Sequence, residues 1–523
     1  MNHGTSHSTV RGLILSALLG LGAAQAASLT MNVVQNFGTI DPAKVTDYTQ
    51  YMSAVNLYDG LLSVAPDGSL KPGIASKWTT SADGKTFTFT IRPGVTFHSG
   101  GSVTAADVVY SMKRALAINQ GPSFLWADIL KPANVTSPAS GQVRFVLNKT
   151  FSPFLNTLPL LFVVNSKALS AHQAAGKFGA NGDYGQQWLT NHDEGSGPYT
   201  LGKLTDGSQL ILNRFARYHQ GFPKGAYDTI NVVINNNDAT ILTMAKTGQL
   251  QMTSQYQAVE TYAALAKLPD WTVSKTASNT VFYLKLNTQR APFDDIHVRR
   301  AVAAAIDYAT IQTSLYPGAA PKGMLAPGSN MSNTSIPSPK QDLAKAKAEM
   351  AQSKYAGKPI NITLMYVSDA TFEQKVGLLV QANLAPLGIT VNLQPAPWNR
   401  ITDLATKVDT TPEITEVFFG PTYPSANSVF YTQYSSEAPH TWASMAWLKD
   451  AQVDSLINQA IATSNESQQK AIYGKLQARL HDLMPDIPLV VQQIQNGFRK
   501  DVLGYQYYPV QSFDLNFRNY RQK

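Results

Sequence analysis

The densest group of residues that could do chemistry is His192-Asp193-Glu194. An imidazole beside two carboxyl groups could hold a divalent metal ion, or it could supply a general acid and a general base. Side chains of adjacent residues diverge, so three consecutive residues rarely converge on one ion. We therefore interpret this segment as a solvated loop. The other histidines are scattered along the chain, and the sequence predicts no metal site and no cofactor.

Two other short motifs resemble parts of enzymes. Asp83-Gly84-Lys85-Thr86 resembles the end of a phosphate-binding loop, but Thr79 stands where that loop needs a glycine. Lys246-Thr247-Gly248 resembles a motif of penicillin-recognising enzymes, whose Ser-x-x-Lys should come earlier, whereas here it begins later, at Ser467. No Gly-x-Ser-x-Gly or His-Glu-x-x-His motif occurs. The sequence therefore predicts a turn at the first motif, no catalytic residue, and a protein that is not an enzyme.

Composition narrows the chemistry further. The 523 residues include no cysteine, which excludes disulfides, cysteine-bound zinc, iron–sulfur clusters and thiol nucleophiles. The net charge is +8, but the basic runs are short, at Lys113-Arg114, Arg299-Arg300 and Arg499-Lys500. Nucleic-acid binding needs a clustered basic surface. We therefore predict a solvated, mildly basic surface and no nucleic-acid partner.

The elements that would position any site alternate between strands and helices. Residues 85–92 alternate between apolar and polar, which predicts a half-buried strand. Thr104 and Asp107 have the spacing of a capping box, which predicts the start of a helix. Residues 360–393 have the pattern of a parallel β-α-β unit. Further helices are predicted at 295–307, 341–352, 452–463 and 467–483. The predicted fold class is α/β with antiparallel inserts, and the length indicates about three domains.

The N-terminus has the pattern of a secretory signal peptide. Arg11 supplies positive charge, an apolar stretch runs from Leu13 to Ala24, and Ala24-Gln25-Ala26 is a small-x-small cleavage site. The apolar stretch is shorter than the roughly 20 residues that span a bilayer. We predict that residues 1–26 are removed and that the mature periplasmic protein begins at Ala27. Because no cysteine follows the cleavage site, we expect no lipid anchor.

An ordered set of short motifs along the mature chain resembles a known family. The motifs are Tyr58-Asp59-Gly60-Leu61-Leu62, Pro66-Asp67-Gly68, Lys71-Pro72-Gly73-Ile74-Ala75, Gly94-Val95-Thr96-Phe97-His98, Thr104-Ala105-Ala106-Asp107-Val108-Val109-Tyr110-Ser111, Gly197-Pro198-Tyr199, Asn287-Thr288, Pro292-Phe293-Asp294-Asp295, Val298-Arg299-Arg300-Ala301 and Pro485-Asp486-Ile487-Pro488-Leu489. This set is similar to the signature of the peptide/nickel family (family 5) of extracytoplasmic solute-binding proteins, which serve ABC importers. The motifs consist mainly of turn glycines, core residues and a helix cap, so they indicate the fold and do not locate a ligand.

The resemblance implies an architecture and a function. The architecture is a class II periplasmic-binding-protein fold, in which two lobes meet at a hinge and an extra domain is inserted in the first lobe. The implied boundaries are 27–58, 195–285 and 492–523 for the first lobe, 59–194 for the inserted domain, and 286–491 for the second lobe. The implied function is capture of a peptide-sized polar solute, oligopeptides by family default, by a monomer that delivers the solute to permease subunits in the membrane.

Alternatives to this function stay open at this stage. A protein with the same fold could bind an oligosaccharide or another neutral solute, or could sense a ligand instead of transporting it, because a fold does not fix a ligand. A secreted hydrolase could also use a two-lobed cleft, although the sequence contains no recognisable nucleophile–base arrangement.

The candidate ligand contacts come from loops that, in the family, face the cleft between the lobes. The chain contains 7 Trp, 23 Tyr and 21 Phe, and aromatic rings can line such a cleft. The candidate residues are Asn36, Phe37, Tyr256, Trp398, Phe419, Tyr423 and Asn427.

The loop at residues 420–427 bears on the kind of ligand. Peptide-binding relatives hold a free α-ammonium with an aspartate in this loop, but here the loop contains no acid, and Thr422 stands about where the aspartate would be. The nearest acids are Glu416 and Glu437. The sequence therefore predicts a neutral, aromatic lining and a ligand whose free N-terminus is not the main anchor.

Overall fold

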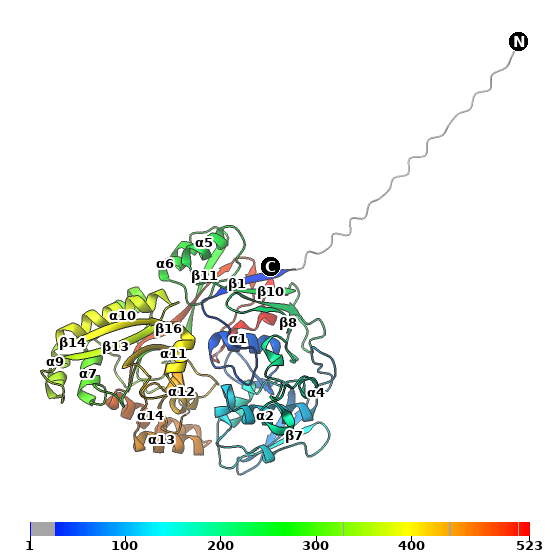
Figure 1. The fold of residues 1–523 in the computed structure, drawn as a ribbon, viewed down its shortest axis with the longest axis horizontal. Helices are drawn as coiled ribbons and strands as arrows, with labels where there is room; N and C mark the ends of the chain where they lie inside the picture. Colours follow the sequence, from blue (N-terminus) through cyan, green and yellow to red (C-terminus); the bar gives the residue numbers. More distant parts are fainter. Residues whose placement is uncertain (2–26, 328, 439–440, 511) are drawn as a thin grey trace.

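The structure is a computed structural model that describes Met1 and residues 27–327, 329–438, 441–510 and 512–523. The predicted signal peptide lies outside the described residues, apart from Met1. Three sheets organise the chain. In Figure 1 the part around β13, β14 and α10 lies on the left, the part around β1, β8 and β10 lies at the upper right, and α2 and β7 lie below the latter.

The first sheet has the strand order β1-β10-β9-β8. β1 (Ser28–Val33) runs parallel to β10 (Thr229–Ile234), while β9 (Gln209–Arg214) and β8 (Tyr199–Thr205) continue the sheet in antiparallel fashion. Helix α1 (Tyr48–Leu57) packs against β8. This sheet therefore brings the N-terminal strand together with segments nearly 200 residues away.

The second sheet has the order β4-β5-β7-β6. Its strands are β4 (Ala75–Thr80), β5 (Thr86–Ile91), β7 (Gln142–Val146) and β6 (Val135–Thr136). The sheet is antiparallel throughout, and helix α2 (Ala105–Ile118) packs against β6 and β7.

The sequence predictions for this region are confirmed. Phe87, Phe89 and Ile91 of β5 are buried while the threonines between them are half-buried. The capping box is present at the start of α2. Gly84 lies in the turn between β4 and β5 with a φ of 67°, a conformation that favours glycine.

The third sheet has six strands in the order β12-β16-β11-β15-β13-β14. β13 (Ile360–Val367) and β14 (Ile389–Ala396) are parallel and are joined by helix α10 (Thr371–Leu384), which confirms the predicted β-α-β unit. The other predicted helices are also present, as α7 (Ile296–Ala305), α9 (Leu343–Gln352), α13 (Ala451–Ala462) and α14 (Glu466–Leu483).

Two long strands run from the six-stranded sheet toward the first sheet. β11 (Trp271–Leu286) pairs along its length with β16 (Asp486–Arg499), and the register shifts between Ala277 and Val281. At the far end of β16, Phe498 forms a bridge to Met252, which in turn bridges to Met31 of β1. The strand pair therefore links the two sheets, and Figure 1 shows it between them.

The remaining helices and strands are shorter. They are β2 (Leu62–Val64), β3 (Leu70–Pro72), α3 (Phe154–Thr157), α4 (Ser166–Ala171), α5 (Asp238–Lys246), α6 (Val259–Leu265), α8 (Tyr308–Thr310), β12 (Gly318–Ala319), α11 (Trp398–Leu404), β15 (Ile414–Phe419), α12 (Ala426–Tyr434), β17 (Val502–Leu503) and β18 (Arg521–Gln522). None of the helices in the described part of the chain is both long enough and apolar enough to cross a membrane.

Two arginines of the short basic runs, Arg114 and Arg299, are buried and do not contribute to the basic surface. Arg114 of α2 is 1% exposed and forms a bidentate ion pair with Asp41, with both nitrogen–oxygen distances at 2.7 Å. The Arg114 Nε also donates to the Tyr184 carbonyl. Arg299 is buried as well and donates to the carbonyl groups of Phe293 and Leu483. Sequence alone could not distinguish these arginines from surface ones, because Asp41, Tyr184 and Leu483 are distant from them in sequence.

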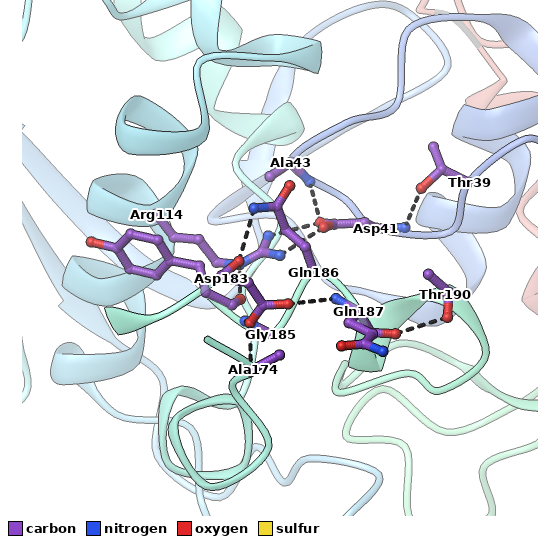
Figure 2. Close-up of polar contacts among 11 residues, drawn as sticks. Thr39, Asp41, Ala43, Arg114, Ala174, Asp183, Gly185, Gln186, Gln187 and Thr190 are labelled. Carbon is purple, nitrogen blue, oxygen red and sulfur yellow. Dashed lines mark hydrogen bonds and ion pairs between the residues drawn. The ribbon is translucent and has the colours of Figure 1, made fainter. Parts of the chain in front are cut away.

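Figure 2 shows how the Arg114–Asp41 pair fastens α2 to the segment that follows β1. Beside it, the Asp183 carboxylate accepts hydrogen bonds from the backbone N–H groups of Ala174, Gly185 and Gln187. These contacts hold the loop that carries Tyr184 against the arginine. The ion pair therefore ties the second sheet's region to the first sheet's region.

The interpretation of 192–194 as a solvated loop is only partly correct. Asp193 forms a buried ion pair with the His98 ring, and Glu194 is 3% exposed and accepts from Ser99 and the Trp188 indole. The His192 ring stacks on Trp188. The three side chains diverge as predicted, and within the described residues no cluster of three or more His, Asp or Glu side chains could hold a metal ion.

Candidate ligand-binding site

Two adjoining cavities, which we call the cleft cavities, lie where the first sheet and the six-stranded sheet meet. Each has a volume of about 70 Å³, and they share the walls formed by Tyr48, Tyr256, Phe418 and Trp442. One cavity is also lined by Gln255, Thr280, Ile494, residues 507–510, Ser512 and Asp514. The other is also lined by Gln35, Asp47, Val367, Ala370, Glu373, Trp398 and Glu416. Residues from both ends of the chain and from both sheets therefore meet here.

The local structure explains why aromatic rings gather at the cleft cavities. Tyr48 is the first residue of α1, Phe418 lies near the end of β15, and Trp398 is the first residue of α11. The rings contact one another: Tyr256 lies 6.0 Å from Tyr48 and 5.9 Å from Phe418, measured between ring centroids. The Trp398 and Trp442 rings are 5.2 Å apart. Each of the five rings is half-buried, so one face of the cluster is available to a ligand.

Four carboxyl groups line the same space. Asp47, Glu373 and Glu416 line one cleft cavity and Asp514 lines the other. All four residues are buried, and Glu416 has no exposed surface. Asp47 caps α1 by accepting from the Gln50 N–H, and Glu373 accepts from the Val367 N–H. Both Glu416 oxygens are buried and make no hydrogen bond.

Burial changes the acidity of these groups. Desolvation raises the pKa of Asp47 to about 6 and that of Asp514 to about 7. It raises the pKa of Glu373 to about 8, and it also raises the pKa of Glu416 well above its usual range, with the nearby Glu373 carboxyl adding to the effect. At neutral pH the protonated form of the two glutamates is therefore favoured.

No cation compensates these carboxyl groups. Among the described residues, no Lys, Arg or His lines either cleft cavity, and none of the ion pairs includes one of the four acids. Two buried acids elsewhere do have a basic partner: Asp41 pairs with Arg114, and Asp486 pairs with Lys285. The cleft therefore concentrates acidic groups without basic partners.

Two larger cavities lie away from this place. One, of about 470 Å³, is lined by residues of α7, α9 and α14 and by the loop at 337–340. The other, of about 380 Å³, lies between residues 124–151 and helices α12 and α13. The second of these also has aromatic rings and two carboxyl groups, those of Asp128 and Glu437. Neither cavity lies between the first sheet and the six-stranded sheet, so the cleft cavities are the candidate site.

The structure brings together two of the residues that the sequence proposed as ligand contacts. Tyr256 and Trp398 line the cleft cavities, and their contact with a ligand stays a prediction. Asn36 is exposed, and its amide is bonded to Asp206 and Gly207 of the β8–β9 hairpin. Phe37 is buried in the core. These last two do not line the cleft cavities.

The three remaining candidates also lie outside the lining of the cleft cavities. Phe419 follows the lining residue Phe418 and points into the core, where it is 2% exposed. Asn427 is buried and donates to the Tyr423 hydroxyl. Tyr423 is 1% exposed and borders the cavity between residues 124–151 and α12–α13.

Sequence reasoning missed most of the acids and part of the aromatic lining. The expected neutral lining is wrong, because acids reach the cleft from α1, α10, β15 and the C-terminal segment. One signal was available: Glu416 interrupts the otherwise apolar and β-branched run Ile414–Phe419. An acid inside a buried strand needs a partner or a function. Asp47 and Asp514 gave no such signal, because only the fold brings them to the site.

The carboxyl groups predict a pH dependence of stability. The folded protein keeps protons on Glu373, Glu416, Asp514 and Asp47 at pH values where the unfolded chain has lost them, so stability falls as pH rises. We expect the free energy of unfolding of the ligand-free protein to fall by at least about 2–3 kcal/mol between pH 5 and pH 8. Urea unfolding at the two pH values measures this, and E373Q should flatten the dependence. A stability that rises over this range would contradict the assignment.

The sequence of the chain is similar to those of known proteins. The model of the bacterial extracellular solute-binding proteins, family 5 Middle, matches residues 69–440. The chain is 26% identical over 489 residues to a probable D,D-dipeptide-binding periplasmic protein of Escherichia coli, covering 91% of each chain. It is 27% identical over 534 residues to di/tripeptide-binding protein 2 of Pseudomonas aeruginosa, covering 96% of this chain and 97% of the relative.

A solved structure shows the same fold. It is a periplasmic binding protein associated with an ABC transporter of Helicobacter pylori, in complex with the peptide STSA. The TM-score is 0.84 at 23% identity, with coverage of 95% of this chain and 98% of the other. The likeness confirms the predicted two-lobed class II fold. The chain belongs to the family 5 bacterial extracellular solute-binding proteins.

Proposed function

We propose that this protein is the periplasmic solute-binding component of an ABC importer. It captures a peptide-sized polar solute between its lobes and delivers the solute to permease subunits in the membrane. The observation that carries the proposal is the aromatic and acidic lining of the cleft cavities, at the junction of the two sheets. The relatives supply the peptide class, since two of them are named for binding dipeptides or tripeptides.

The same proposal covers the division of the chain. The first lobe comprises residues 27–58, 195–285 and 492–523, the inserted domain 59–194, and the second lobe 286–491. The three larger sheets support this division, since each has its strands mainly in one of the three parts. The exception is β11, which joins the six-stranded sheet although it lies almost wholly in the range of the first lobe. Strands β11 and β16 cross between the lobes and serve as the hinge.

Ligand entry requires the lobes to separate. Sites for small molecules usually have volumes of roughly 300–1,000 Å³, whereas each cleft cavity has about 70 Å³. Bending at the crossing strands, where the register shifts between Ala277 and Val281, would widen the space. Closure would then remove the solute from water, and the permease would recognise the closed form.

The proposal also includes the export of the protein, its oligomeric state and its lack of catalytic activity. The protein loses residues 1–26 and works as a monomer in the periplasm. It carries no lipid anchor, because lipidation after a signal peptide needs a cysteine and the chain has none. It does no chemistry of its own. The family and the relatives are binding proteins, which supports a non-enzymatic role.

Calorimetry on refolded, ligand-free protein tests this function. Titration with a panel of dipeptides, tripeptides and oligosaccharides should give one ligand per chain, and mass spectrometry of the recovered solute should show it unchanged. We expect Y256A to weaken binding about 10- to 100-fold, because the ring forms a shared wall of both cleft cavities. Y431A is the matched control, since Tyr431 lines the cavity beside α12 instead. Steady release of product by repurified protein would support a hydrolase.

A further inference from the structure

The acidic side of the cleft points to a specific kind of solute. We propose that the site selects its solute by a positively charged nitrogen group, held by Glu373, Glu416 and Asp47, and makes no use of a carboxylate on the solute. This inference rests on the proposed solute-binding function and narrows its substrate class to cations.

Glu416 is the first observation that supports a cationic ligand. Its side chain has no exposed surface, lines a cleft cavity, and has two buried oxygens without a hydrogen-bond donor. A Cβ added to Gly377 of α10 would lie 3.4 Å from Glu416 Oε1, so the carboxyl group reaches the underside of that helix. Buried polar groups normally have partners, and one without a partner beside a cavity is suited to a donor from a ligand.

The contrast with other buried acids is the second observation. Asp107 accepts four hydrogen bonds, two from Thr104 and two from Ser166. Asp41 and Asp486 each have a cationic partner. Each of these acids therefore has at least one partner within the protein, whereas neither oxygen of Glu416, beside the cleft, has one.

The surrounding rings are suited to the same ligand. Tyr48, Tyr256, Phe418, Trp398 and Trp442 line the cavity that contains the three acids. The faces of aromatic rings attract cations, and this attraction adds to that of a carboxylate. A volume of about 70 Å³ suits a compact head group such as an ammonium. A cation bound there would stabilise the ionised form of the glutamates, which burial alone disfavours.

The lining also explains why a solute carboxylate is not used. Among the described residues, neither cleft cavity is lined by Lys, Arg or His. Asp514 lies on the second cavity, so an anionic end placed there would meet a buried acid. A solute with a blocked or absent carboxylate should therefore bind at least as well as a zwitterion.

This inference replaces the expectation drawn from the loop at 420–427. That loop has no acid, as the sequence shows, but Glu416, Glu373 and Asp47 supply acids from β15, α10 and the start of α1. An ammonium anchor is therefore available at a different place. The competing interpretation is that Glu373 and Glu416 form a protonated pair that only fills space beneath α10.

Calorimetry at pH 7 with matched probes tests the proposed selectivity. The probes are dialanine amide, dialanine, N-acetyl-dialanine amide, agmatine and cellobiose. Dialanine amide should bind at least as tightly as dialanine, and N-acetyl-dialanine amide should bind at least about 100-fold more weakly. The inference is overturned if the tightest probe carries no positive charge, or if no cationic probe binds below about 1 mM.

The same panel separates this inference from the proposed function. If agmatine binds and no dialanine derivative does, cation selection stands and the peptide class fails. If cellobiose binds and no cation does, the solute-binding function stands and cation selection fails.

Two isosteric variants test the residues. E416Q and E373Q should each weaken binding of the tightest cationic probe at least about 30-fold, because a glutamine side chain cannot ionise to pair with the bound cation. E260Q is the matched control, and its affinity for the probe should stay within about 2-fold of that of the unmodified protein. Glu260 is exposed on α6 and pairs with Lys375 of α10, the helix that also carries Glu373. If E416Q and E373Q both bind within about 3-fold of the unmodified protein, the two glutamates only fill space and the proposal is wrong.

Discussion

Replacing Lys285 with methionine is expected to lower the free energy of unfolding by about 3–5 kcal/mol. Lys285 lies on β11 opposite Asp486 of β16, and its Nζ is 2.7 Å from Asp486 Oδ2. Neither side chain is exposed. The substitution leaves a buried carboxyl group without its cation, at the start of one of the two strands that cross between the lobes.

The loss of stability in K285M should depend on whether Asp486 is still present. K285M/D486L removes both charges and should regain at least half of the lost stability, because a buried pair can often be replaced by apolar residues. K354M is the matched control, since Lys354 pairs with Asp294 at the surface and such pairs contribute about 0–1 kcal/mol. Urea unfolding measures all three. A loss below about 1 kcal/mol in K285M would contradict the account of this pair.

The second large effect is expected for R114M, which should also lower the free energy of unfolding by about 3–5 kcal/mol. The substitution leaves Asp41 buried and unpaired, and it removes the Arg114 donor to the Tyr184 carbonyl. Because the pair joins α2 to the segment after β1, limited proteolysis should cut the region of residues 59–194 faster in R114M than in the unmodified protein.

R300M is the control for this experiment. Arg300 follows a buried arginine in sequence, but its guanidinium is at the surface and donates to the Asp482 carbonyl. It should change the free energy of unfolding by less than about 1 kcal/mol. Equal losses in R114M and R300M would show that the Asp41 contact does not hold the inserted region.

Local patterns predicted the elements well because their causes are local. The alternation in β5, the capping box of α2 and the β-α-β unit of β13, α10 and β14 each depend on residues within one short segment. Turn glycines such as Gly84 were equally predictable. The resemblance to a family then supplied the arrangement of these elements, which periodicity alone does not give.

The candidate site was less predictable because it is assembled from distant segments. Tyr256 and Trp398 were proposed because, in the family, loops at their places face the cleft, and both line the cleft cavities. Asp47 and Asp514 are more than 460 residues apart in the sequence and meet the same space only in the fold. Phe419 and Phe418 are neighbours on one strand, and a strand sends successive side chains to opposite faces. The choice between them could not be made from sequence.

Identification of the solute that the protein carries tests the central claim most directly. Native protein purified from its own cells, without unfolding, would be analysed by mass spectrometry before and after denaturation. We predict one small solute per chain, released unchanged, with a nitrogen group that is positively charged at neutral pH. A bound solute without such a group, or a protein that carries no solute and binds none of the cationic probes, would contradict the account.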